Sequence, residues 1–433
     1  MGKGQELYNY AKKVIPGGTQ LLSKRPEQFL PDHWPAYYSR AEGCQIWDLD
    51  FNEYTDVSFM GIGACVLGYA FPHVDTAVKT AIDKGSMSTL NAPEEVFLAE
   101  KLLSLHHWAD MIRYAKAGGE ATAQAVRIAR AATGKDKILF CGYHGWHDWY
   151  LSANILESDS LDEHLLSGLD PAGVPKGLKG TAIPFRYNDI DEFRRLCDQH
   201  GDDLAAVVME PVRNDPPYKG FLDDIREYTQ QKGIVLIFDE ITAGFRLTCG
   251  GSHLTFKVNP DIAIFGKALG NGYPITAIIG RKEVMTAAQD TFMSSTFWTE
   301  RTGFAAALAM IDFYLKHNLE HHLIDIGIMV QEGWKQIAQS NGLTVEVGGI
   351  APLSHFTFKD GDPLVYKTYF TQEMLKMGYL ATTSFYASYA HKKETVQRYL
   401  EASDKVFKKI ASSPDLSKEL DGPVCHSGFQ RLI

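Results

Sequence analysis

Residues 234–240 are Ile-Val-Leu-Ile-Phe-Asp-Glu and residues 262–267 are Ile-Ala-Ile-Phe-Gly-Lys, and these two stretches decide the fold. In each, an apolar run is followed at once by charged or flexible residues. A run that is apolar at every position predicts a strand buried on both faces, as in parallel sheets covered by helices. Ligands bind at the carboxyl ends of such strands. Asp239 and Lys267 are therefore the first candidate site residues.

The segments around these runs alternate between helix-forming and apolar stretches. Such alternation predicts an α/β domain in which helices cover both faces of a mostly parallel sheet. The expected helices are Glu120–Thr133, Ile190–His200, Leu222–Lys232 and Phe304–Lys316. The expected strands are Lys137–Phe140, Leu204–Met209, Ile234–Phe238, Ile262–Phe265 and Thr276–Ile279.

The two ends of the chain have a different pattern. A hairpin is expected at Gln45–Asp50 and Asn52–Asp56, around an Asp-Phe-Asn turn. Further strands and helices are expected at Thr344–Val347, Leu353–Phe358, Pro363–Met377 and Glu394–Ala411. The prediction is a large α/β domain over residues 57–322 and a smaller α+β domain that residues 1–56 and 323–433 form together.

Composition limits the classes of function. The chain has 433 residues, of which 45% are hydrophobic and 22% charged, and its net charge is −10. An acidic chain without a basic tract is expected to bind neither nucleic acid nor an anionic membrane surface. Six scattered cysteines without a CxxC pair, a polar N-terminal segment and no long apolar run predict a soluble cytoplasmic protein.

Several familiar motifs are incomplete. The glycine at Gly63 is not followed by the third glycine of a dinucleotide fingerprint, and Lys267 lacks the upstream glycine of a P-loop. Cys141, His144 and His147 recur at three-residue spacing, which leaves a metal site open. However, a zinc site needs three or four convergent ligands, and the sequence has no partner Cys/His cluster. We therefore expect a loop with aromatic and imidazole contacts and no metal site.

Four pieces remain, and each alone has an ordinary structural explanation as a turn, packing or helix cap. Gly118 and Gly119 precede a helix, whose bare amides attract an anion. Tyr143 follows a strand and could stack on a planar ligand. Asp239 is a carboxylate that needs a cationic or hydrogen-bonding partner. Lys267 is a buried amine, favourable as an imine. Together they match the groups that pyridoxal phosphate requires.

These motifs occur in an order that resembles class III aminotransferases, which are pyridoxal-phosphate enzymes of fold type I, and among them the glutamate-1-semialdehyde aminomutase branch. The resemblance extends over most of the chain. It is carried by residues 15–18 (Ile-Pro-Gly-Gly), 118–122 (Gly-Gly-Glu-Ala-Thr), 141–145 (Cys-Gly-Tyr-His-Gly), 210–211 (Glu-Pro), 238–246 (Phe-Asp-Glu-Ile-Thr-Ala-Gly-Phe-Arg) and 266–274 (Gly-Lys-Ala-Leu-Gly-Asn-Gly-Tyr-Pro).

The resemblance implies roles around the cofactor ring. Lys267 would form the Schiff base and, once released, move a proton. Asp239 would pair with the pyridine nitrogen and keep it protonated. Tyr143 would stack on one face of the ring and Ile241 press on the other. The resemblance also implies cofactor contacts from His144 and Glu210.

The resemblance also implies how the cofactor phosphate is bound. The amides of Gly118 and Gly119 would hold it. The family commonly has Ser-Gly-Thr where this chain has Ala117, Gly118 and Gly119, so two hydroxyls are absent. Thr296 matches a family threonine that reaches the phosphate of the neighbouring subunit, which implies a homodimer with shared active sites.

Candidate substrate residues lie where the chain departs from the family. Arg213 could bind a substrate carboxylate or phosphate, or it could pair with Asp215 or another surface acid. Near the N-terminus either Lys24 or Arg25 could bind a substrate carboxylate, and a two-pronged contact favours Arg25. Trp34 could shape the pocket, although aromatic side chains more often pack in a core.

The resemblance implies an aminotransferase that moves an amino group from an amino acid, with glutamate as the expected donor, to a small oxo-acid, aldehyde or ketone. Residues 287–293 lack the Gly/Pro-rich gating loop of the aminomutases, which favours intermolecular transfer. The alternatives are a 2,1-aminomutase and a pyridoxal-phosphate decarboxylase or racemase. A non-catalytic binding protein would need neither Lys267 nor Asp239.

Overall fold

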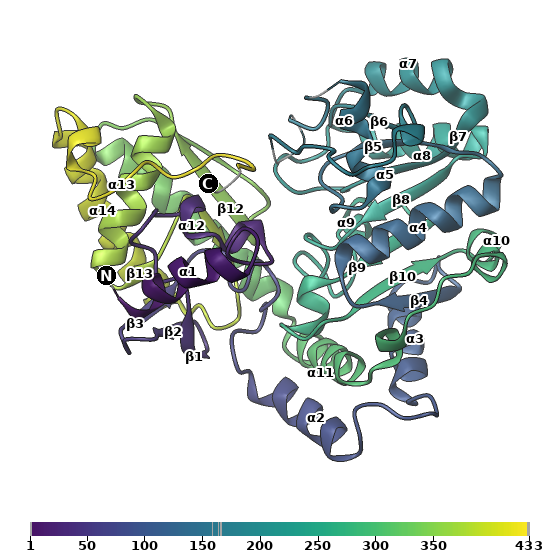
Figure 1. Ribbon diagram of the computed structural model, residues 1–433, viewed down its shortest axis with the longest axis horizontal. Coiled ribbons are helices and arrows are strands. Elements are labelled where there is room, and N and C mark those ends of the chain that lie inside the picture. The colour runs from purple at the N-terminus through teal and green to yellow at the C-terminus, as the bar shows by residue number, and fades with distance from the viewer. Residues whose placement is uncertain (1, 158, 163, 165–166, 431–433) are drawn as a thin grey trace. The chain divides into compact units, whose positions relative to one another are not determined.

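The computed structural model describes residues 2–157, 159–162, 164 and 167–430. The chain divides into two compact units (Figure 1). One consists of Pro72–Glu320, and the other combines Met1–Phe71 with His321–Ile433. Within the part of the chain that the structure describes, no helix combines the length and the apolar composition needed to cross a bilayer.

The unit of residues 72–320 is built on a seven-stranded sheet of order β4-β10-β9-β8-β7-β5-β6. Strands β6, β5, β7, β8 and β9 are parallel neighbours in this order. Strands β7, β8 and β9 are buried at every position, as their uniformly apolar sequences predict. The strands are β4 (Met111–Ala115), β5 (Lys137–Cys141), β6 (Ala182–Pro184), β7 (Leu204–Met209), β8 (Val235–Asp239), β9 (Ile262–Phe265) and β10 (Thr276–Gly280).

Helices cover both faces of this sheet, which confirms the predicted α/β class. Alternate residues of β5 pack against helices on opposite faces of the sheet. Ile138 and Phe140 pack in a cluster with residues of α4, whereas Leu139 packs in a second cluster with residues of α7 and α8. The helices of this unit are α2 (Pro72–Asp83), α3 (Glu94–Leu105), α4 (Gly118–Thr133), α5 (Asp148–Leu151), α6 (Ala153–Leu156), α7 (Ile190–His200), α8 (Phe221–Lys232), α9 (His253–Phe256), α10 (Lys282–Met285) and α11 (Thr302–His317).

The sheet is mostly parallel, as predicted, and β10 is the strand that differs. It runs antiparallel to both of its neighbours, β4 and β9. The chain passes from β9 to β10 through one short 3₁₀ helix, Lys267–Gly270. A parallel return needs a crossover of a dozen or more residues. The short connection therefore reverses the strand, and the sheet is mixed.

The second unit contains two small sheets, of order β1-β2-β3-β13 and β11-β12-β14. The predicted hairpin forms as antiparallel β2 and β3, with Phe51 in the left-handed region at its turn. Strand β13 pairs with β3, so segments from both ends of the sequence share one sheet. The elements are α1 (Lys3–Val14), β1 (Tyr38–Glu42), β2 (Gln45–Asp48), β3 (Glu53–Asp56), α12 (Leu319–Ser340), β11 (Val345–Gly348), β12 (Leu353–Phe358), α13 (Pro363–Lys376), β13 (Tyr379–Leu380), β14 (Ser384–Tyr386) and α14 (Lys393–Ser412).

Candidate active site

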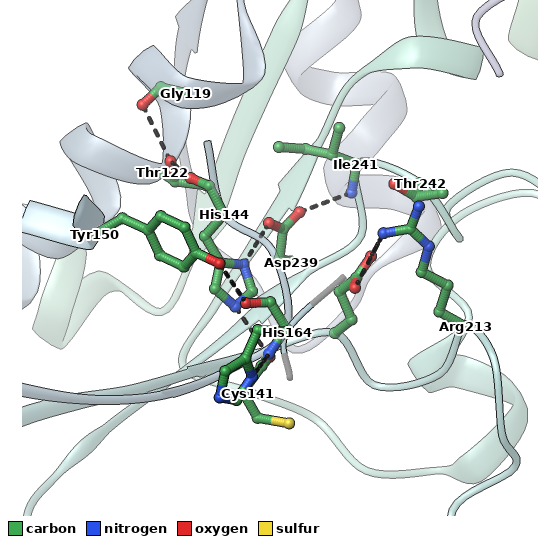
Figure 2. A network of polar contacts seen from close by, with 12 residues as sticks. Gly119, Thr122, Cys141, His144, Tyr150, His164, Arg213, Asp239, Ile241 and Thr242 are labelled. Atoms are coloured by element: carbon green, nitrogen blue, oxygen red, sulfur yellow. Dashed lines mark hydrogen bonds and ion pairs between the residues drawn. The ribbon is translucent and has the colours of Figure 1, made fainter. Parts of the chain in front are cut away.

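The candidate residues gather at the carboxyl edge of the large sheet. Asp239 is the last residue of β8, and Glu210 directly follows β7. His144 lies just after β5, and Lys267 lies just after β9. Since these strands are parallel neighbours, their carboxyl ends meet at one edge. Figure 2 shows the polar contacts around Asp239, His144 and Arg213.

Asp239 is held by two hydrogen bonds and is only 3% exposed. Its Oδ1 accepts from the backbone amide of Ile241 at 3.0 Å, and its Oδ2 lies 2.8 Å from His144 Nδ1 (Figure 2). The other ring nitrogen, Nε2, lies 3.0 Å from the carbonyl oxygen of Cys141. Because that oxygen can only accept, Nε2 carries a hydrogen. One further proton then lies between His144 and Asp239, which orients the carboxylate.

Lys267 presents a primary amine with unusual properties. Its Nζ donates to Thr242 Oγ1 at 2.8 Å. Burial lowers the pKa of this amine to about 8, and Arg213 acts in the same direction while Glu210 and Asp239 oppose it. The backbone at Lys267 is left-handed, with φ at +44°. Such conformations cost on the order of 1–2 kcal/mol for a side chain other than glycine and occur preferentially at functional sites.

The first turn of α4 leaves little space for side chains at its two glycines. A β-carbon on Gly118 would lie 3.0 Å from Ile241 Cδ1, and one on Gly119 would lie 2.9 Å from His147 Cδ2. The Glu120 carboxylate turns back to accept from the amides of Lys116 and Ala117, at 3.1 Å each. The amides that open a helix have no partner within the helix. Those of Gly118 and Gly119 therefore suit a phosphate.

Arg213 lies beside Glu210, with its Nη1 3.4 Å from each carboxylate oxygen (Figure 2). The sequence leaves open a pairing with Asp215 or a surface acid, but the acid that Arg213 contacts is buried. Burial raises the pKa of Glu210, and Arg213 opposes that rise. Next to this pair is a cavity of about 210 Å³. Its lining residues are Cys141, Gly142, His164, Arg186, Tyr187, Glu210, Arg213, Asn214 and Asp215.

Tyr143 and Ile241 both lie partly buried against the α4-side hydrophobic cluster. The Tyr143 ring is edge-on to Tyr150, with ring centres 5.8 Å apart. Thr296 begins a 3₁₀ helix, Thr296–Thr299, and is exposed.

The remaining substrate candidates belong to the other unit. Arg25 donates to the carbonyl oxygen of Gln430 at 3.0 Å, and its guanidinium lies over the Phe429 ring. Lys24 is exposed. Trp34 is buried and stacks on Phe29 with ring centres 4.6 Å apart, as a core residue does. A substrate role for Lys24, Arg25 and Trp34 stays a prediction.

The structure brings two residues to the site whose place there the sequence does not predict. Thr242 contacts Lys267, and its signal in the sequence is its position three residues after Asp239. His147 lies against Gly119, whereas the sequence singles it out only for its spacing from Cys141 and His144.

Comparison with solved structures defines the class of protein. The FumI protein of Sphingopyxis sp. MTA144, solved in its pyridoxal-phosphate internal aldimine form, is 28% identical and superposes with a TM-score of 0.86 over 94% of this chain and 97% of its own. The fold is thus that of a pyridoxal-phosphate enzyme.

Sequence comparison then identifies the family. The model for class-III aminotransferases matches residues 30–398. A 3-aminobutyryl-CoA aminotransferase of Cloacimonas acidaminovorans is 32% identical over 86% of this chain and 88% of its own. A glutamate-1-semialdehyde 2,1-aminomutase of Methanosarcina acetivorans is 32% identical over 93% and 97%. The chain belongs to the class-III aminotransferase family, whose cofactor is pyridoxal phosphate.

Proposed function

We propose that this protein is an aminotransferase that moves an amino group from an amino acid, expected to be glutamate, to a small oxo-acid, aldehyde or ketone, with Lys267 binding the cofactor covalently. The observation that carries the proposal is the amine of Lys267, whose pKa burial lowers to about 8, near the buried carboxylate of Asp239. Only a neutral amine attacks an aldehyde, and this pKa makes a neutral amine available near pH 8.

The residues present fit the cofactor. The glycine amides at the start of α4 would hold its phosphate, and a side chain at Gly118 or Gly119 would crowd Ile241 or His147. Tyr143 and Ile241 would flank the ring, and Asp239 would receive the ring N–H. When bound, pyridoxal phosphate withdraws the electron pair left behind as a proton leaves the substrate.

Side chains of this protein would carry out the proton transfer, hold the reacting groups and bind the substrate anion. The free amine of Lys267 would remove a proton from the substrate carbon and deliver a proton to the C4′ carbon of the cofactor. Thr242, at 2.8 Å, orients that amine. Asp239, oriented by His144, keeps a positive charge on the ring nitrogen. Arg213, beside Glu210, provides a cation for a substrate carboxylate or phosphate.

Absorbance spectroscopy tests the proposal. Purified protein should show the visible band of pyridoxal phosphate bound to an amine, and borohydride should fix the cofactor on the peptide that contains Lys267. The Lys267→Ala variant should lose both properties. Amino acids that bleach the band identify the donor. Attachment at another lysine, or no bleaching by any amino acid, would contradict the proposal.

A 2,1-aminomutase is the second candidate, because a relative with that name is 32% identical over 93% of this chain. The two reactions differ in what they consume. A mutase converts one substrate completely without a second oxo-acid, whereas a transaminase stops after one half-reaction. Product analysis with glutamate-1-semialdehyde alone, and then with glutamate and an added oxo-acid, separates them.

A homodimer with shared active sites and a cytoplasmic location form part of the proposal. The dimer is supported by large apolar side chains around Thr296. Phe292 is 90% exposed and Phe297 is 65% exposed. Covering such side chains is favourable, and exposed apolar groups often mark an interface. The location rests on composition alone.

A further inference from the structure

Two aromatic side chains lie beside the first turn of α4. Trp146 and His147 stack on each other, with ring centres 4.4 Å apart and ring planes 28° apart. One ring nitrogen of each lies near Gly119, and Trp146 itself is 68% exposed. The position of a β-carbon on Gly119 lies 3.3 Å from His147 Nε2 and 3.5 Å from Trp146 Nε1. Both donors therefore adjoin the amides assigned to the cofactor phosphate.

The loop after β5, which contains Trp146 and His147, packs closely against the start of α4. Gly145 adopts φ +102°, and a β-carbon on it would lie 2.9 Å from the Cα of Gly119. The Thr122 hydroxyl lies 2.9 Å from the carbonyl oxygen of His144 and 3.0 Å from that of Gly119 (Figure 2). These contacts at His144 and Gly145, directly before the two rings, hold the loop against the start of α4.

His147 Nε2 is buried, and among the described residues it has no hydrogen-bond partner. A buried polar atom without a partner costs about 1–3 kcal/mol, so such an atom in a folded protein calls for an explanation. Gly119 provides one. Its missing side chain leaves the space that the imidazole fills, and an anion at the helix start would reach both groups.

We propose that His147 Nε2–H, supported by Trp146 Nε1–H, donates a hydrogen bond to the phosphate of the cofactor, so that side chains from the loop after β5 replace the hydroxyl that Gly119 lacks. The inference rests on the function proposed above. Two backbone amides leave most phosphate oxygens without a donor, and a ring N–H is well suited to one of them. Burial lowers the pKa of His147, which favours a neutral ring that still has one hydrogen to donate.

The test compares ligands with and without a phosphate on apoprotein prepared from the full chain. The probes are pyridoxal phosphate, pyridoxal and inorganic phosphate, and dissociation constants are measured by equilibrium dialysis. His147→Phe keeps the stacked ring but removes the donor. His147→Gln keeps an N–H near the position of Nε2. His200→Phe is the matched control, because His200 contacts Lys137 at the opposite end of β5.

His147→Phe should weaken binding of pyridoxal phosphate and inorganic phosphate about tenfold or more and change pyridoxal binding less than about twofold. His147→Gln should restore part of the loss, Trp146→Phe should cause a smaller loss, and His200→Phe should cause none. The ³¹P resonance of bound cofactor should shift in His147→Phe.

Two results would overturn the inference: equal losses for pyridoxal and pyridoxal phosphate, which indicate a structural effect, or unchanged phosphate binding in His147→Phe. Wild-type apoprotein that binds neither pyridoxal phosphate nor phosphate would instead refute the proposed function together with this inference. Tight wild-type binding that the variant retains refutes the inference alone.

Discussion

At the residue scale, Lys267 combines two unfavourable features in one position. Its backbone is left-handed, and its amine has lost enough hydration that its pKa falls to about 8. Each feature costs free energy that the surrounding packing must offset. The neighbouring Ala268, Leu269 and Gly270 are buried and hold the turn in place. The same packing that strains the residue prepares its amine to react.

The rate of cofactor uptake should therefore depend on pH through Lys267. Because burial lowers the pKa of the amine from 10.5 to about 8, the neutral, nucleophilic form accumulates above about pH 8. The rate constant for reconstitution of apoprotein with pyridoxal phosphate should rise from about pH 7 to about pH 9 and then level off. Stopped-flow absorbance measures it. A rate that rises only above about pH 10 would contradict the lowered pKa.

Replacement of Asp239 by asparagine should slow catalysis without unfolding the protein. The amide keeps the shape of the carboxylate but cannot keep a positive charge on the ring nitrogen. The half-reaction with the amino donor should slow on the order of a hundredfold. Asp136→Asn serves as the control, because it alters an exposed carboxylate directly before β5, at the end of the sheet opposite the site. An unchanged half-reaction rate in Asp239→Asn would refute its assignment.

At the scale of the element, helix α4 shows how local chemistry sets the ends of a helix. It begins two residues before the predicted Glu120, at Gly118, where the glycines are part of the first turn. It ends at Gly134, which is left-handed at φ +67° and whose amide bonds back to the carbonyl oxygen of Arg130 at 2.8 Å. A glycine in this position relieves strain that any side chain would add.

Gly134→Ala should lower the free energy of unfolding by about 1 kcal/mol. A β-carbon there would meet no atom within 4 Å, so the loss comes from the left-handed backbone rather than from a clash. Gly201 offers a matched control, because its surroundings are equally open but its φ is −52°. Gly201→Ala should be neutral or slightly stabilising. Denaturant unfolding of the two variants measures the difference, and equal effects would contradict this account.

The apolar pattern of β10 does not predict whether the strand runs parallel or antiparallel to its neighbours. Its apolar residues predict burial, and all five are buried. Inner strands are buried on both faces whether they are parallel or antiparallel. The apolar pattern therefore does not indicate the direction of the strand. The length of the connection from β9 decides the direction instead.

At the scale of the whole molecule, the proposed dimer predicts that active sites are shared between subunits. If Thr296 serves the neighbouring site, mixed dimers of Lys267→Ala and Thr296→Ala chains contain one site with both residues intact. In a one-to-one co-refolded mixture half of the dimers are mixed and each has one intact site. About a quarter of all sites should then bind pyridoxal phosphate more tightly than Thr296→Ala alone does. Titration of the mixture measures both values. Affinities equal to those of the separate variants would refute shared sites.

The sequence by itself determined the α/β class, the buried strands and the family, because apolar runs and the glycine and charged residues at their ends act over a few neighbouring residues. It also indicated Asp239 and Lys267 as candidate site residues, since both lie at the carboxyl ends of buried strands. Contacts between distant segments were decided only by the tertiary structure. His144 meets Asp239 across 95 positions, and Arg213 contacts the buried Glu210. These pairings depend on which strands become neighbours, and that depends on packing of the whole sheet.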